Sequence, residues 1–286
     1  RSIPNDYKTK YAKLSQDAKH IDGLILGNSH SLYGLNPEYL EGNWYNASHI
    51  SQSSSMDWAI FSKYKEDFKN LKYIVLPISY FSFYESLEKG DEAWRLKNYS
   101  LYYNIKFKNI LKNKSELLSI PIAKQFQRLY DYYILSKDEV HINKHGWDTS
   151  YHLSKAMSLE ETGRIAAKRH SIDVMNLDLY QESIDLNKKY LRLFLDWAEQ
   201  HKVQVILFSP PVHQEYYVNT QEEQWELNKN ILKEICKHPC IYLDFNKTDI
   251  FEDTDFYDAD HLSDKGAKKL TKALAERLKP LENKRL

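Results

Sequence analysis

The N-terminal part of the chain carries a strand pattern, a helix pattern and a second strand pattern in succession. The aliphatic residues 24–26 end at Gly27 and Asn28, where a buried strand should break into a turn. Apolar residues then recur at helical spacing over 56–71, behind a serine cluster that can cap a helix. The run 72–79 (KYIVLPIS) predicts another buried strand. Together these segments predict a parallel βαβ unit.

The C-terminal part repeats this alternation. A long amphipathic pattern over 180–202 predicts a helix, and the apolar run 203–209 predicts the strand that follows it. Thr220 and Glu223 are spaced as a capping box at the start of a further helix. Residues 240–245 predict another strand. A final helix is indicated by apolar residues at helical spacing: Ala267, Leu270, Leu274 and Leu278.

The middle of the chain, approximately residues 81–175, shows helical patterns without a convincing strand. These patterns cover 101–111, 122–135 and a segment that opens with a capping box of Ser158 and Glu161. They indicate a helical insertion or cap. We therefore expect one α/β domain, a three-layer sandwich with a mostly parallel central sheet, that carries this insertion.

Composition narrows the choice of partners. In the chain, residues 1–286, 40 basic and 40 acidic residues cancel, and neither sign forms a long run. Nucleic acid and an anionic membrane surface are therefore not expected as main partners. The longest apolar stretches fall far short of the roughly 20 residues that cross a bilayer. The first residues lack the apolar core of a signal segment, so a removed N-terminal anchor or a membrane-anchored partner stays open.

The cysteine count excludes a disulfide framework, because the chain has only Cys236 and Cys240. One local bridge between them is an alternative. We favour two ordinary thiols near a helix end.

A serine and an aspartate–histidine pair could carry chemistry. Ser29 follows the first predicted strand at a glycine-containing turn, so it should be displayed rather than packed. Asp258 and His261 are spaced so that the carboxylate can hold the imidazole Nδ1–H and leave Nε2 free as a base. Loops after the strands of a parallel sheet gather along one edge, so these three residues can meet. Such a base activates a serine hydroxyl, which is otherwise a weak nucleophile.

These segments resemble the SGNH/GDSL hydrolase superfamily. Gly27, Asn28 and Ser29 match its first block, in which the nucleophile follows the first strand. Asp258 and His261 match the D-x-x-H block that supplies the other two members of the triad.

The resemblance extends to one branch of that superfamily. Residues 261–267 match the H-L-x-x-x-G-A pattern of a branch resembling cell-surface glycan O-acetyltransferases and the D-alanyl-transfer protein of teichoic acids. The similar regions are about residues 20–80 and 180–280. The resemblance implies an SGNH-like, flavodoxin-like sandwich and an extracytoplasmic or cell-envelope location.

Two further blocks depart from the family pattern. The second block is expected at residues 46–48, where Ser48 replaces the usual glycine, and its backbone N–H can still join that of Ser29 in an oxyanion hole. The third block should follow the second predicted strand, but no asparagine is present there. Asn46 and Ser79 are the candidates to replace the missing donor. Removing one oxyanion donor costs about 3–4 kcal/mol of transition-state stabilisation.

Other polar residues near these segments are candidate substrate contacts. Besides Asn46 and Ser79, they are His30, beside the nucleophile, and Trp147, in the polar loop NKHGWDTSYH. Most acids of the run 252–260 are expected to form a solvated turn. Asp258, Asp260 and His261 could ligate a divalent ion together with His30, but these residues lack a recognised ligand spacing. We therefore expect neither a metal nor a cofactor.

The function implied by the resemblance is that of an SGNH-type serine esterase or O-acyltransferase. The substrate would be an acyl ester, an acetyl ester in particular, of a surface carbohydrate or a small molecule. Ser29 would be the nucleophile, His261 the base and Asp258 the residue that orients the base. One alternative is a catalytically degenerate SGNH-fold module that binds glycan or a partner protein. Another is a flavodoxin-like domain whose turn cradles phosphate, although that turn has only one glycine.

Overall fold

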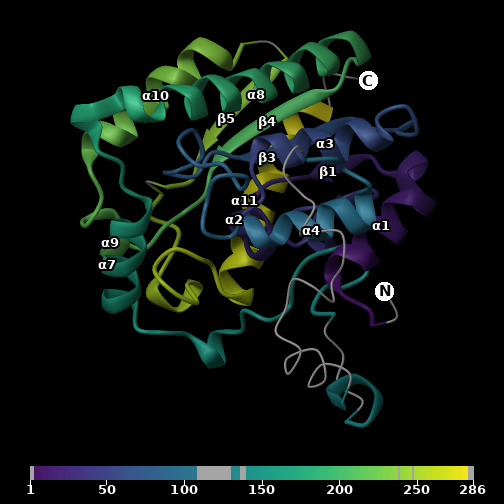
Figure 1. Cartoon of the computed structure of the whole chain (residues 1–286), viewed down its shortest axis with the longest axis horizontal. Coiled ribbons are helices and arrows are strands. Elements are labelled where there is room, and N and C mark those ends of the chain that lie inside the picture. The colour runs from purple at the N-terminus through teal and green to yellow at the C-terminus, as the bar shows by residue number, and fades with distance from the viewer. Residues whose placement is uncertain (1–2, 108–129, 136–139, 238, 247, 283–286) are drawn as a thin grey trace.

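The computed structural model describes residues 3–107, 130–135, 140–237, 239–246 and 248–282. Within these residues, the centre is a five-stranded sheet in which every neighbouring pair runs parallel (Figure 1). The strand order β2-β1-β3-β4-β5 is that of flavodoxin-like doubly wound folds. The strands are β1 (Gly23–Ile25), β2 (Trp44–Asn46), β3 (Tyr73–Pro77), β4 (Gln204–Ser209) and β5 (Cys240–Asp244).

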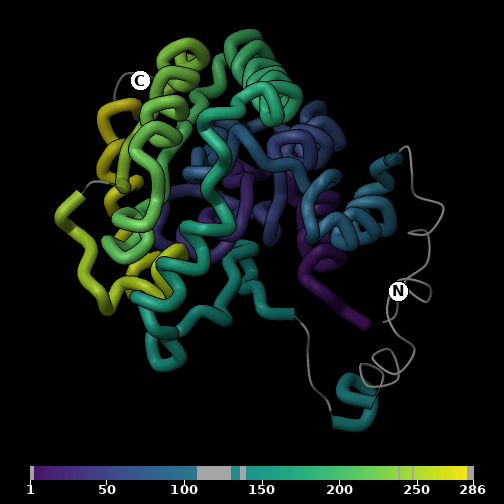
Figure 2. Tube along the Cα trace, turned by 60° about the vertical axis from the view of Figure 1, so that its left-hand side comes forward, coloured from purple at the N-terminus to yellow at the C-terminus, as the bar shows by residue number. Residues whose placement is uncertain are grey.

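Helices cover both faces of the sheet (Figure 1, Figure 2). One face packs against α1, α3, α8 and α10, and the other packs against α2 and α11. Among the described residues, no helix is both long enough and apolar enough to cross a membrane. The helices are α1 (Asp6–Asp17), α2 (Ser29–Gly34), α3 (Ser54–Tyr64), α4 (Leu96–Asn98), α7 (Leu159–His170), α8 (Gln181–His201), α9 (Gln214–Tyr217), α10 (Glu222–Ile235) and α11 (Asp264–Glu282).

Strand β3 shows how the sequence pattern builds this sandwich. Ile74 and Leu76 point to the core under α3 and α8, whereas Tyr73 and Val75 point to the core under α11. All five residues of the strand are buried, as expected for a parallel strand covered on both faces. The α/β class and the parallel sheet predicted from the sequence are therefore confirmed.

Element boundaries differ from the sequence predictions in several places. The helix expected over 56–71 is α3, which begins at Ser54 and ends at Tyr64. The sequence patterns do not predict α1 or β2, and β2 is only three residues long. The capping box at Thr220 is wrong, because α10 begins after Gln221 and the Thr220 hydroxyl donates to a backbone carbonyl instead. Ser158 is the N-cap of α7 and its side chain accepts the Glu161 N–H, which is one of the two hydrogen bonds of the predicted capping box.

The middle of the chain adds helical turns and no strand of the sheet among its described residues. A π-helical segment, Tyr99–Tyr103, stops at Asn104, whose φ of 58° is left-handed. The helix expected over 101–111 therefore ends early, and its residues from 108 lie outside the described part. Of the helix expected over 122–135, residues 122–129 also lie outside it.

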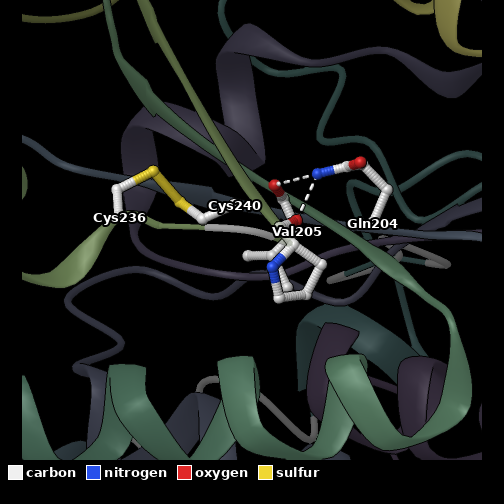
Figure 3. Close-up of a disulfide and its surroundings, with 5 residues drawn as sticks. Gln204, Val205, Cys236 and Cys240 are labelled. Carbon is white, nitrogen blue, oxygen red and sulfur yellow. Dashed lines mark hydrogen bonds between the residues drawn. A yellow bond between two sulfur atoms is a disulfide. The ribbon is translucent and has the colours of Figure 1, made fainter.

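The two cysteines form a disulfide, so the expectation of two free thiols is wrong (Figure 3). Cys236 follows the last residue of α10, and Cys240 begins β5. The turn between these elements brings the two Cα atoms to 5.1 Å, well within the range that a disulfide spans. Gln204 braces the same turn, because its side-chain amide donates to the carbonyl of Pro239.

Candidate active site

The turn after β1 is built for glycine. Gly27 has a φ of 112°, and a Cβ at this position would lie 2.2 Å from the ring of Pro77 at the end of β3. A larger residue would therefore meet both backbone strain and a steric clash. Asn28 follows as the N-cap of α2, and its side chain accepts the N–H of His30. Ser29 is the first residue of that helix and lies at the carboxyl edge of the sheet.

A buried carboxylate anchors the same turn. Asp57, in the first turn of α3, accepts the Gly27 N–H at 2.7 Å and the side-chain amide of Gln52 at 2.7 Å. Burial raises the pKa of Asp57 to about 7, although these two hydrogen bonds act in the opposite direction. Tyr99 donates its hydroxyl to the other end of the Gln52 amide, so the middle of the chain also supports the turn.

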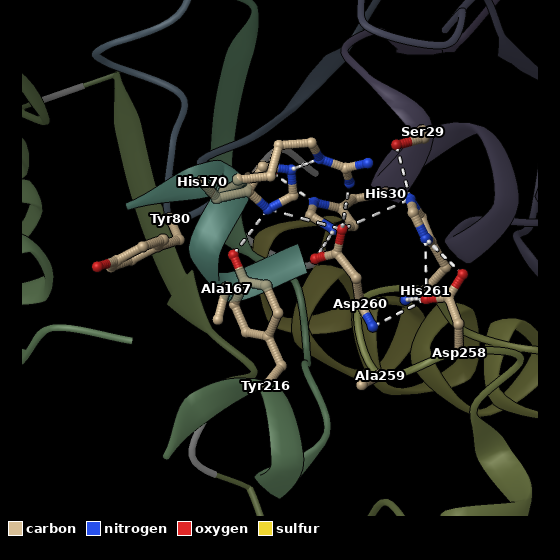
Figure 4. A network of polar contacts seen from close by, with 12 residues as sticks. Ser29, His30, Tyr80, Ala167, His170, Tyr216, Asp258, Ala259, Asp260 and His261 are labelled. Atoms are coloured by element: carbon tan, nitrogen blue, oxygen red, sulfur yellow. Dashed lines mark hydrogen bonds and ion pairs between the residues drawn. The ribbon is translucent and has the colours of Figure 1, made fainter. Parts of the chain in front are cut away.

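The serine, histidine and aspartate singled out from the sequence meet in space (Figure 4). His261 Nε2 lies 2.8 Å from Ser29 Oγ, and His261 Nδ1 lies 3.1 Å from both carboxylate oxygens of Asp258. These distances fall within hydrogen-bond reach for a nucleophile, its base and the group that orients the base. The network assigns the tautomer: Nδ1–H donates to Asp258, which leaves Nε2 to accept the serine proton.

The charges of this cluster support one another. Burial alone would lower the pKa of His261, but Asp258 and Asp260 outweigh it and raise that pKa above its ordinary value. Burial alone would likewise raise the pKa of Asp258, but the nearby imidazole lowers it. The geometry therefore favours an ionised Asp258 and an imidazole that readily accepts a proton.

Aromatic rings hold the imidazole from the sides. Tyr33 and Tyr151 stack with centroids 3.7 Å apart, and Tyr257 stacks on the other side of Tyr151 at 3.9 Å. The ring of His261 stands edge-on to both Tyr33 and Tyr151, at interplanar angles of 88°. Rings in these arrangements contribute attraction beyond their buried area. Two segments far apart in sequence thus fix the orientation of one histidine.

The polar loop 143–152 supplies Tyr151 to this aromatic stack and also contacts the backbone of Tyr33. Trp147 is buried, and its indole N–H donates to the carbonyl of Tyr33 at 2.7 Å. Gly146 has a φ of 81°, and a Cβ there would lie 2.1 Å from the carbonyl oxygen of Asn46. The sequence prediction that Trp147 touches substrate is therefore corrected: this side chain supports the wall from behind.

The second block is arranged differently from the expectation. The Ser48 N–H donates to the side chain of Asn46, and both residues are fully buried. The side-chain NH₂ group of Asn46 donates to the backbone carbonyls of Ser31 and Leu35. Neither residue lines the cavity at the triad, so Ser48 is not the second oxyanion donor and Asn46 is not a substrate contact. Ser51 lines that cavity instead, and its φ of 55° is the conformation that a glycine would favour.

The third block is also closed to substrate. Ser79 follows β3 and is 1 % exposed. Its N–H donates to the hydroxyl of Ser82, and its hydroxyl is shared between Asn28 and His30. Ser79 therefore cannot act as the missing oxyanion donor without giving up one of these bonds.

His30 belongs to the interior as well. Its Nδ1 lies 2.6 Å from Ser79 Oγ, and its Nε2 lies 3.0 Å from a carboxylate oxygen of Asp260 (Figure 4). Asp260 is 2 % exposed, so the solvated turn expected for the acidic run is wrong at this residue. His30 does not line the cavity, which corrects the expectation that it contacts substrate.

A cavity of about 630 Å³ opens at the triad. This volume lies within the roughly 300–1,000 Å³ typical of small-molecule sites. Ser29 and His261 form part of its wall. Aromatic, cationic and hydroxyl-bearing side chains form further parts, among them Tyr33, Phe81, Tyr151, Arg169 and the serines at 51, 53 and 54.

Sequence reasoning missed Asp57 and Arg169, and it weighed Asp260 only as a metal ligand. Asp57 gives a weak signal, since an acidic residue in the first turn of a helix is common for reasons of the helix dipole alone. Arg169 lies near the end of α7, and the capping-box pattern that marks the start of that helix gives no signal for it. Asp260 directly precedes His261, and that adjacency is the one signal that could have found it.

One group of described residues could offer ligands to a metal ion. A nitrogen of His30, a carboxylate oxygen of Asp260 and a nitrogen of His261 all lie within 4.8 Å of one another. Each of these atoms already faces a hydrogen-bond partner: His30 faces Asp260, and His261 faces Ser29. The site is therefore complete as a hydrogen-bonded network.

No protein-family model matches the chain, and no curated protein matches it.

Proposed function

We propose that the protein is an SGNH-type serine esterase or O-acyltransferase that uses Ser29, His261 and Asp258. The observation that carries the proposal is the continuous line of contacts from Ser29 Oγ to His261 Nε2 and from His261 Nδ1 to Asp258. Ser29 lies at the start of α2, Asp258 and His261 lie on the loop before α11, and each donor and acceptor matches the role that acyl transfer requires. The flavodoxin-like strand order supports the same family.

The first half-reaction follows from these contacts. Ser29 Oγ attacks the acyl carbonyl carbon while its proton passes to His261 Nε2. The carbonyl π electrons move to oxygen, which gives a tetrahedral oxyanion. When this intermediate collapses, the bond to the alcohol oxygen breaks, and His261 returns the proton to that oxygen. The acyl group is then bound to Ser29 as an ester. Asp258 stays ionised throughout and stabilises the imidazolium.

The oxyanion side has one clear donor. Among the described residues, the Ser29 N–H has no hydrogen-bond acceptor, and it lies at the first turn of α2. A donor in this position can bind the developing oxyanion of a group attached to its own side chain. Because Ser48 and Ser79 are engaged elsewhere, we expect slower acyl transfer than in enzymes with a full set of donors.

The second half-reaction differs between the two activities. A water or a sugar hydroxyl attacks the acyl-enzyme carbonyl, and His261 takes the proton of the attacking oxygen. The serine ester bond breaks, and the same proton returns to Ser29 Oγ. Water as acceptor releases the free acid, whereas a sugar hydroxyl receives the acyl group.

The composition of the cavity supports a polar, hydroxyl-bearing substrate such as a carbohydrate ester. Its volume of about 630 Å³ exceeds what an acetyl group needs, so part of the leaving alcohol or the acceptor can enter as well. Serines 51, 53 and 54 offer hydroxyl groups, and Phe81 offers an aromatic face. The disulfide of Cys236 and Cys240 supports placement in an oxidising, extracytoplasmic compartment.

A fluorophosphonate probe tests the proposal, because it reacts only with an activated serine. We expect covalent labelling of the wild type and loss of labelling in Ser29→Ala and in His261→Ala. Ser263→Ala is a matched control, since this buried serine lies two residues after His261 and contacts neither Ser29 nor the cavity. Turnover of p-nitrophenyl acetate should follow the same order.

The rival is a degenerate SGNH-fold module that binds glycan or a partner protein. It is favoured by the engagement of Ser48 and Ser79 in internal hydrogen bonds. Under this alternative the wild type would show neither labelling nor turnover, while glycan binding measured by calorimetry would be unchanged in Ser29→Ala.

A further inference from the structure

Two side-chain contacts join the turn after β1 to the loop before α11. The turn holds Ser29 and is called the nucleophile turn here, and the loop holds Asp258 and His261 and is called the base loop. The first joins Ser29 to His261, and the second joins their sequence neighbours, His30 and Asp260 (Figure 4). The triad needs only the first contact. The second is 3.0 Å long and is formed by side chains that are 2 % and 3 % exposed. A buried pair at this position therefore requires its own explanation.

The hydrogen bonds of His30 fit a ring that carries a proton on Nε2. Ser79 Oγ accepts from the amide of Asn28, so its own O–H is available to donate to His30 Nδ1. His30 Nε2–H then donates to Asp260 Oδ1. Both ring nitrogens of His30 then have a hydrogen-bond partner, and the Asp260 carboxylate accepts from Nε2–H. This series of hydrogen bonds links the end of β3, the nucleophile turn and the base loop.

The second carboxylate oxygen of Asp260 faces Nε2 of the His261 ring. Asp260 Oδ2 lies 4.0 Å from His261 Nε2, the nitrogen that receives the proton of Ser29. Asp258 lies on the opposite side of the ring, at Nδ1. The imidazole of His261 is thus flanked by a carboxylate at each nitrogen. A charge this close and this well shielded from water acts strongly on the ring.

We propose that Asp260 and His30 are positioning residues of the same site: their buried pair fixes the nucleophile turn against the base loop and keeps a second negative charge beside the Ser29–His261 contact. This inference rests on the proposed function. Asp260 does not carry a proton in the reaction. It favours the protonated imidazole that forms when Ser29 attacks, and His30 holds its carboxylate in place.

Other groups around His261 set the field in which Asp260 acts. Asp258 and Asp260 come from its own loop, and His30 and Tyr33 come from α2. Tyr151 comes from the polar loop. From α7, Arg169 and His170 lie 3.7 and 3.8 Å from Asp260 Oδ2. Burial lowers the pKa of His170 to about 3, so this ring is neutral and Arg169 is the permanent cation opposite Asp260.

The test is the titration of His261, followed by NMR of protein with ¹³C-labelled histidine. Comparison with the spectrum of His261→Ala identifies its signal. We expect Asp260→Asn to lower the proton affinity of His261 about ten-fold relative to wild type. The midpoint of the acid limb of kcat/KM for p-nitrophenyl acetate should move to lower pH by the corresponding amount, about one pH unit. A purely structural role for Asp260 would not produce this shift.

The chain offers a matched control. Asp253 and His213 form another aspartate–histidine pair 3.0 Å apart, but the Asp253 side chain is 83 % exposed. Asp253→Asn removes the same charge where water screens it, so the proton affinity of His261 should change less than two-fold. An Asp260→Asn titration that matches the Asp253→Asn titration would overturn the proposal.

A second variant covers the case in which Asp260→Asn does not fold. His30→Leu removes the donor at Asp260 Oδ1 without leaving a large cavity. We expect the proton affinity of His261 to change by more than about three-fold, and an unchanged affinity contradicts the inference. The titration requires no turnover. An unlabelled, inactive wild type would therefore contradict the proposed function alone, and an unmoved titration would contradict this inference alone.

Discussion

The two halves of the candidate site differ in how closely they follow the resembled family. The triad half comprises the turn after β1 and the loop that holds Asp258 and His261, and its contacts are complete. The oxyanion half comprises the segments after β2 and β3. There the backbone N–H groups of Ser48 and Ser79 donate to protein side chains rather than to the cavity.

The difference lies in the kind of group on which each half depends. The triad half depends on three side chains, each of which is visible in the sequence as a motif. The oxyanion half depends on backbone N–H groups, whose direction is set by φ and by competing acceptors. Ser51 illustrates the point, since its left-handed φ of 55° lies three residues beyond the position expected for the family glycine.

Loss of the carboxylate in the triad half should produce the largest effect. Asp258→Asn keeps the shape of the side chain but donates where a carboxylate accepts, so it favours the wrong tautomer of His261. We expect kcat for p-nitrophenyl acetate to fall about 10⁴-fold. A fall of less than ten-fold would mean that His261 does not need its partner and that the triad half is not the catalytic half.

The anchor of the nucleophile turn should come next. Asp57→Ala leaves the Gly27 N–H and the Gln52 amide without their shared acceptor. We expect the free energy of unfolding to fall by about 2–4 kcal/mol, because buried donors lose their partner and a buried side chain is truncated. Chemical denaturation measures this change. Asp57→Asn keeps one acceptor oxygen, so it should cost less, and equal losses in the two variants would contradict the anchoring role.

The pH dependence of kcat/KM should show an effect of intermediate size. His261 must be neutral to accept the proton of Ser29, and its pKa is raised above the ordinary value of 6.5 by Asp258 and Asp260. The rate should therefore fall as the pH decreases through that raised pKa, with the half-maximal kcat/KM above pH 6.5. A midpoint below 6.5 would indicate that burial outweighs the two carboxylates.

The smallest effect should come from restoring the family glycine at the expected position. Ser48→Gly leaves the backbone N–H on Asn46, so kcat/KM should stay within about two-fold of wild type. The free energy of unfolding should fall by about 0.5–1 kcal/mol through the greater backbone entropy of glycine. A ten-fold gain in kcat/KM would show that the Ser48 N–H reaches the oxyanion after all.

Sequence patterns predicted much of this architecture because the sheet is buried on both faces. Continuous apolar runs mark β3 and β4, and helical spacing marks α8 and α11. Strand β2 is as short as β1 but reads Trp-Tyr-Asn, without the aliphatic run that marks β1, so the sequence did not reveal it. The disulfide depends on the turn before β5, whose geometry the spacing of two cysteines does not specify.

The triad could be predicted because its chemistry demands particular residue types at particular strand ends. Asp260 and Asp57 could not, because an aspartate on a surface turn and a buried one look alike in sequence. What distinguishes them is burial and a partner from another segment: His30 for Asp260 and the Gly27 N–H for Asp57. The same holds for Trp147, whose aromatic ring could equally face substrate or pack behind the wall.

The separation of 232 residues between Ser29 and His261 has a consequence for synthesis. At roughly 5–20 residues per second, a ribosome takes about 10–50 s to travel from the serine codon to the histidine codon. During that interval the turn after β1 holds a serine without a base. His261 arrives with α11, which packs on the same face of the sheet as α2. Under the proposed function, recovery of ester cleavage during refolding should therefore require the docking of α11 as well as formation of the sheet.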